Sequence, residues 1–179
     1  LKEAIAVPNA FASYRTDTNI AFGTVGNRYE IVQNLEAFDF FDEIIGQGHA
    51  AYETAGALGN GETIFITAKL PSKLIVKKED IDKYLLFTMS HDGSGSIKIM
   101  FTPIRVVCNN TLSAALSGKE KVTIKHTKNA RERLDLAPTL LGITKSASEK
   151  YEQVFDRFTR VAIDDQSVED FVDRIFNFV

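Results

Sequence analysis

Five residues in the middle of the chain have side chains suited to acid–base or nucleophilic chemistry. They are His91, Asp92, Arg105, Cys108 and His126. A thiol paired with an imidazole can act as an activated nucleophile. Cys108 follows an apolar run and precedes a short helical pattern, and a thiol near a helix N-terminus has a lowered pKa. The pattern also fits a small buried hydrophobic residue at a strand–helix junction, and we favour that interpretation.

Metal and nucleotide motifs are not indicated. His49, His91, Cys108 and His126 stand far apart, whereas zinc ligands usually occur as closely spaced pairs. The glycines of the chain occur in turn-like segments and do not form a phosphate-binding loop between a strand and a helix. We therefore predict no metal and no cofactor.

A block rich in Lys and Arg is the strongest chemical signal. Residues 69–133 contain 13 bases and six acids, whereas residues 29–68 contain seven acids and no Lys or Arg. Lysine and arginine contact phosphates, and aromatic rings stack on unpaired bases, so the block predicts single-stranded DNA binding. The candidate residues are Tyr84, Lys98, Arg105, Lys119, Lys121, Lys125, His126, Lys128, Arg131 and Arg133.

The aromatic residues near this block divide into two groups. We expect Phe65, Phe87 and Phe101 to pack in the core, as aromatic residues in hairpins usually do under a helix, and Tyr84 to be the exposed ring. The segregation of charge, within a net charge of −3, has a second explanation. The basic block of one subunit can meet the acidic block of another, which would give a structural homo-oligomer.

Composition sets the broad class. The chain has 179 residues, 44% hydrophobic and 25% charged, which is typical of a globular protein. One cysteine rules out an internal disulfide, and no apolar run approaches the length of a membrane helix. We expect a cytoplasmic protein that does not associate with membranes.

Hydrophobic periodicity predicts the elements that position these residues. Strands are expected at 10–16, 20–25 and 29–33, then hairpins 49–70 and 84–107, each around a glycine-rich turn, and a strand at 121–126. Helices are expected at 34–46, where Asn34 is the N-cap, at 111–116 and in the C-terminal third, with a helical turn at 78–82. The fold class is α+β: an antiparallel, hairpin-rich, twisted sheet packed on one face by helices 34–46 and 110–117, with C-terminal helices. We divide the chain into a core domain, 1–135, and a C-terminal helical segment, 136–179.

Five segments of the chain are similar to one family. They are Tyr29–Asn34, Glu53–Leu58, Ser90–Ser94, Thr102–Leu112 and Lys125–Thr127. Together they resemble the phage/plasmid-like protein family, a domain of unknown function numbered 932, over about residues 10–135. The resemblance implies a mobile element within a bacterial host cell and assigns no catalytic residue.

We predict a non-enzymatic protein that binds or anneals single-stranded DNA during replication or recombination of a mobile element. Phage annealing proteins also have hairpin sheets backed by helices, although this analogy concerns the fold alone. The alternatives are an enzyme that acts on nucleic acid through the His, Asp, Arg and Cys residues named above, and a structural homo-oligomer.

Overall fold

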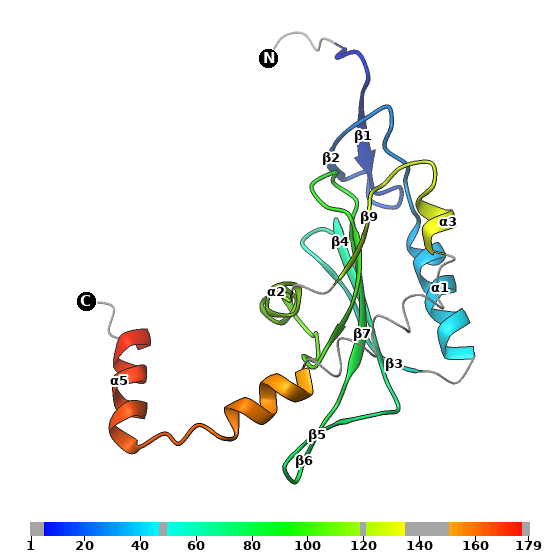
Figure 1. Ribbon diagram of the computed structural model, residues 1–179. Helices are drawn as coiled ribbons and strands as arrows, with labels where there is room; N and C mark the ends of the chain where they lie inside the picture. Colours follow the sequence, from blue (N-terminus) through cyan, green and yellow to red (C-terminus); the bar gives the residue numbers. More distant parts are fainter. Residues whose placement is uncertain (1–5, 47–49, 119–120, 135–150, 177–179) are drawn as a thin grey trace.

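The computed structural model describes residues 6–46, 50–118, 121–134 and 151–176, and is centred on a five-stranded antiparallel sheet (Figure 1). The strand order is β3-β4-β7-β8-β9. The bounds are β3 Ala51–Leu58, β4 Thr63–Lys69, β7 Tyr84–Ser90, β8 Ile97–Thr102 and β9 Val122–Ile124. Strand β9 is an edge strand, which leaves one side of its backbone without a neighbouring strand of this sheet.

Tight turns connect the central strands, as their sequences predict. Between β3 and β4, Gly59 and Gly61 have φ angles of +63° and +105°, which a side chain at Cβ would disfavour. The backbone N–H of Asn60 also donates to the Glu62 carboxylate over 2.7 Å. These contacts fix the register in which Ala57 lies opposite Ile64.

Both faces of the sheet are covered, each by a different helix. Helix α1 (Asn34–Gly46) packs on the face that carries Ile66, Phe87 and Ile99, and α3 (Ala130–Leu134) contributes the buried Ala130 to the same cluster. Helix α2 (Asn109–Leu116) packs on the opposite face. The cluster under α2 contains Phe65, Leu86, Met100, Val106, Leu112 and Ala115.

This arrangement corrects the expectation that helices 34–46 and 110–117 share one face. Figure 1 shows α1 and α3 on one side of the sheet and α2 on the other. The reason is visible in β7, where every residue is buried. A strand without an exposed face needs a cover on both sides.

Two small hairpins extend from this core. Strands β1 (Ala10–Tyr14) and β2 (Ala21–Gly26) pair as expected. The expected strand at 29–33 is wrong, because this segment has no strand structure, although Glu30 N–H donates to the His126 carbonyl over 3.1 Å. The expected helical turn at 78–82 is also wrong: β5 (Leu74–Val76) pairs with β6 (Glu79–Ile81) around Lys77, whose φ is +56°.

The C-terminal part is helical, as predicted. Residues 151–158 form a helix, and Tyr151 packs on Phe101 with ring centroids 5.2 Å apart. Helix α5 (Asp165–Phe176) follows and projects away from the sheet in Figure 1. Asp164 caps α5, since its carboxylate accepts the Ser167 N–H over 2.8 Å. The α+β class, with an antiparallel sheet and C-terminal helices, is confirmed.

Candidate nucleic-acid interface

Three lysines lie together on the α2 face of the sheet, at the edge formed by β8 and β9. Val122 and Ile124 pack toward the α1 face, so alternation turns Thr123 to the opposite face, together with the flanking residues Lys121 and Lys125. Lys98 lies opposite Thr123 in the ladder. We call Lys98, Lys121 and Lys125 the lysine strip.

The three members of the strip differ in their contacts. Lys121 Nζ donates to the carbonyl oxygens of Leu116, over 2.8 Å, and Gly118, over 3.3 Å. A cation at this position satisfies the carbonyls at the C-terminal end of α2 and opposes the helix dipole. Within the described residues, Lys98 and Lys125 form no side-chain hydrogen bond or ion pair. Their ammonium groups are therefore available to a phosphate.

The remaining candidates of the block lie after the strip or outside the described part. Lys128 and Arg133 are exposed. Arg131 belongs to α3, but its side chain lies outside what the structure describes, and Lys119 falls in the undescribed segment 119–120.

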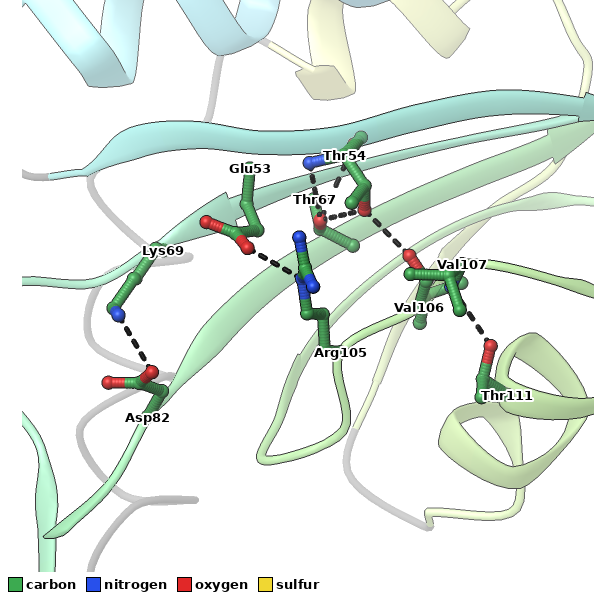
Figure 2. Close-up of polar contacts among 9 residues, drawn as sticks. All are labelled: Glu53, Thr54, Thr67, Lys69, Asp82, Arg105, Val106, Val107 and Thr111. Atoms are coloured by element: carbon green, nitrogen blue, oxygen red, sulfur yellow. Dashed lines mark hydrogen bonds and ion pairs between the residues drawn. The ribbon is translucent and has the colours of Figure 1, made fainter.

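Most of the other basic residues that the structure describes upstream of β9 are held by acids or carbonyls. Arg105 pairs with Glu53 over 2.6 Å, Lys69 with Asp82 over 2.7 Å, and Figure 2 shows both pairs on the same side of the sheet. The hydrogen bond between Lys69 and Asp82 raises the pKa of the lysine and lowers that of the carboxyl. Lys73 pairs in the same way with Asp80 over 3.1 Å. Acids thus compensate Arg105, Lys69 and Lys73, whereas within the described residues no acid pairs with the lysine strip.

The expectation that Tyr84 is an exposed ring, available to stack on a base, is wrong. Its side chain is 5% exposed, because β7 is covered on both faces, and burial raises the pKa of its phenol. A ring at this depth cannot stack on a base. Phe65, Phe87 and Phe101 are buried, as expected.

The histidines and Asp92 lie near the end of β7. His91 Nε2 forms a 2.7 Å hydrogen bond with Asn34 Oδ1, so Asn34 holds this imidazole instead of capping α1 as expected. His126 is 7% exposed and stacks on Tyr29 with ring centroids 4.7 Å apart. Burial lowers the pKa of both imidazoles, and the nearby His126 charge lowers that of His91 further.

These residues do not form an acid–base pair with one another. Asp92 bonds to Ser90 and Ser94, and His126 Nδ1 lies 3.1 Å from the Glu30 carbonyl. His126 Nε2 is buried without a hydrogen-bond partner. The arrangement is that of two fixed neutral imidazoles, one of which borders a cavity.

Cys108 and Arg105 lie on the α2 side of the sheet, apart from the histidines. Cys108 is the N-cap of α2, whereas the sequence favours Asn109 or Asn110 in that role, and it is exposed, which corrects the expectation of a buried residue. The hydrogen bond between the thiol and the Thr111 hydroxyl lowers the pKa of the thiol. The five residues considered for catalysis are thus divided between two faces.

The described residues present neither a metal-binding cluster nor a membrane-spanning helix. Across residues 6–46, 50–118, 121–134 and 151–176, no group of three or more His, Cys, Asp or Glu side chains is placed to hold a metal ion. None of the helices in these ranges is long and apolar enough to cross a membrane.

Sequence reasoning missed two features of the structure. One is a threonine pair, Thr54 and Thr67, that connects the sheet to the segment before α2 (Figure 2). Threonines in two adjacent strands that are rich in β-branched residues are a weak sequence signal for such a pair. The other is a cavity of about 600 Å³ between the β1–β2 hairpin and α1, whose walls come from segments far apart in sequence.

These features define an α+β protein whose sheet is covered on both faces and carries lysines at one edge. The chain belongs to the family described as Domain of unknown function (DUF932), whose model matches residues 21–178. The match extends through the C-terminal helices, beyond the region in which the sequence motifs were noted. No curated protein and no solved structure matches the chain.

Proposed function

We propose that the protein binds single-stranded DNA along the lysine strip. The observation that carries this proposal is the alternation at β9, which turns Lys121 and Lys125 to the same face as Lys98. An edge strand with lysines on one side provides a linear set of cations, and a single strand of DNA provides a linear set of phosphates. Exposed Lys128 and Arg133 lengthen the basic surface.

The binding is electrostatic and depends little on stacking, because Tyr84 is buried. Each phosphate that a cation neutralises on a single strand contributes about −0.7 to the slope of log affinity against log salt. Lys98 and Lys125 have no competing partner within the described residues, so each is expected to contribute to this slope.

A salt titration of a labelled single-stranded oligonucleotide tests the proposal. The double variant K98A/K125A is expected to bind more weakly and to have a slope about 1.4 units less negative than the unmodified protein. The matched control is K73A, which removes a cation paired with Asp80 on the β5–β6 hairpin and should leave both quantities unchanged. Absence of binding at low salt, or equal binding by K98A/K125A, contradicts the proposal.

The setting of this activity is also part of the proposal. Motifs of the chain resemble the phage/plasmid-like proteins, which supports a role in annealing or protecting DNA strands of a mobile element within a bacterial cell. An annealing assay with two complementary labelled oligonucleotides separates the two roles. Acceleration by the protein supports annealing, and binding without acceleration supports protection alone.

A second candidate function is self-association through α5. Its apolar residues are exposed: Val168 by 48%, Phe171 by 64% and Val172 by 43%. A helix of 12 residues is marginal by itself in water, so this stripe gains stability when another surface covers it. We propose that a second copy of the chain supplies that surface, which is a different contact from the pairing of basic and acidic blocks considered above.

A further inference from the structure

A cavity of about 600 Å³ opens between the β1–β2 hairpin and the N-terminal end of α1. This volume lies in the range of small-molecule sites. Ala57 and Ile64 line the cavity from the α1 face of the sheet, so the cavity is separate from the lysine strip.

Aromatic rings form much of the wall. Tyr14, Phe22, Tyr29 and His91 all line the cavity. Phe22 and His91 are close to parallel, with centroids 6.0 Å apart, and Tyr29 is fixed from behind by its stacking on His126. Tyr14 is 56% exposed, so its ring has surface available at the mouth of the cavity. Flat rings of this kind favour a flat ligand.

The rim of the cavity is apolar and in contact with water. Leu35 is 71% exposed and Ile31 46%, and both border the opening. Exposed apolar residues that gather around a concave site indicate a surface that binds something. A ligand that covers them removes apolar area from water.

The polar groups of the wall are amides and a neutral imidazole. Asn34 Oδ1 is hydrogen-bonded to His91. Among the described residues, neither the Nδ2 amide group of Asn34 nor the side chain of Gln33 has a hydrogen-bond partner. Burial lowers the pKa of His91, so its ring is neutral at pH 7. Amides and neutral imidazoles recognise donor and acceptor edges of a heterocycle.

The charged side chains of this wall form an ion pair. Arg15 and Asp17 are its charged members, and they neutralise each other through two hydrogen bonds, of 2.8 and 3.0 Å. Arg15 Nη1 also bonds to the Asn60 carbonyl over 2.9 Å. Three of its five N–H donors are thus used within the protein and its charge is balanced by Asp17, which weakens its attraction for a phosphate or carboxylate.

From these observations we infer that the cavity binds an uncharged, planar heteroaromatic ring with hydrogen-bonding edges, of the nucleobase kind. The ring lies against Tyr14 and Leu35, and its edge meets the amides of Gln33 and Asn34. This inference goes beyond the proposed DNA binding and does not depend on it, because the residues belong to the opposite face of the sheet.

Isothermal titration of the full chain with adenosine, guanosine, cytidine and thymidine tests the inference. At least one nucleoside is expected to bind, and Y14A is expected to weaken it at least about fivefold, as loss of a stacking ring does. Y14F keeps the ring and should bind as the unmodified protein does. V107A removes an exposed apolar side chain beyond the cavity and serves as the matched control.

Three results overturn the inference: no nucleoside binds, Y14A binds as tightly as Y14F, or benzyl alcohol binds as tightly as every nucleoside. The last result would mean an unselective apolar pocket. The unfolding midpoints of Y14A and Y14F show whether a loss of binding is a loss of folding. The K98A/K125A variant separates the two proposals, since it should lose DNA binding and retain nucleoside binding.

Discussion

The hydroxyl group of Thr54 donates a 2.6 Å hydrogen bond to the backbone carbonyl of Val106. Thr54 lies on β3 and Val106 in the segment that leads into α2, so this bond ties the helix to the sheet (Figure 2). Since the Thr54 proton is used in this way, the Thr67 hydroxyl donates to Thr54 Oγ1. The pair thus satisfies a carbonyl of a residue that is 0% exposed.

Replacement of Thr54 by valine should therefore destabilise the fold. T54V keeps the shape of the side chain but removes the donor to the Val106 carbonyl, and the Thr67 hydroxyl keeps only its contacts with the Thr54 backbone. The expected loss in the free energy of unfolding is about 1–3 kcal/mol, as for other unsatisfied buried groups. Urea denaturation measures it, with T54S, which keeps the hydroxyl, as the control. Equal stability of T54V and the unmodified protein would show that the bond is dispensable.

Removal of the Glu53 charge should strengthen DNA binding. Glu53 pairs with Arg105, whose side chain is 58% exposed, so E53Q releases a cation on the α2 side. If Arg105 then contacts a phosphate, the salt slope becomes about 0.7 more negative. The stability cost is at most about 1 kcal/mol, because the pair is partly exposed.

The control for E53Q is D80N, which releases Lys73 on the β5–β6 hairpin. Oligonucleotide titrations of both variants at several salt concentrations give the comparison. An unchanged slope for E53Q would remove Arg105 from the interface, and an equal gain for D80N would show a non-specific effect of net charge.

Acidification should destabilise the protein as histidine titrates. Burial lowers the folded-state pKa of His126 below its ordinary value of 6.5, so the unfolded chain takes up the proton first. Stability from the neutral imidazole is therefore complete above pH 6.5 and is lost as pH falls below it. His91 contributes in the same direction.

Urea denaturation between pH 7.5 and pH 5.5 measures this dependence. H126F keeps a ring to stack on Tyr29 and removes the titrating group, so its stability should vary less with pH than that of the unmodified protein. H126F also removes a nitrogen, Nε2, that is buried without a partner. An identical pH dependence in the two proteins would contradict the assignment.

The sequence predicts the sheet better than it predicts what covers the sheet. The hairpin turns around Gly59 and Gly93 are local signals, and the alternation of Val122 and Ile124 with polar neighbours could have placed Lys121 and Lys125 on one face. Tyr84 shows the limit. Tyr84 is buried because β7 is covered on both faces, and the residue pattern within the strand does not predict the second cover.

The site was harder to predict for a similar reason. The net charge of residues 69–133 does not show that Arg105, Lys69 and Lys73 are paired. The fold brings Asp82 to Lys69 and Asp80 to Lys73, and the partner of Arg105, Glu53, lies far away in sequence. Likewise, the walls of the cavity derive from β1, β2, α1 and the ends of β3, β4 and β7. Such convergence depends on tertiary packing, which a single sequence does not display.

Substitution of Phe171 should test self-association. Phe171 is 64% exposed at the centre of the apolar stripe of α5, between Val168 and Val172. F171D places a charge in that stripe, where a helix–helix contact would bury it at high cost. The molar mass from light scattering, measured over a range of protein concentrations, is expected to rise for the unmodified protein and to stay at 19.9 kDa for F171D. The control is D170N, on the polar side of the same helix, and a constant monomer mass for the unmodified protein would exclude the homo-oligomer.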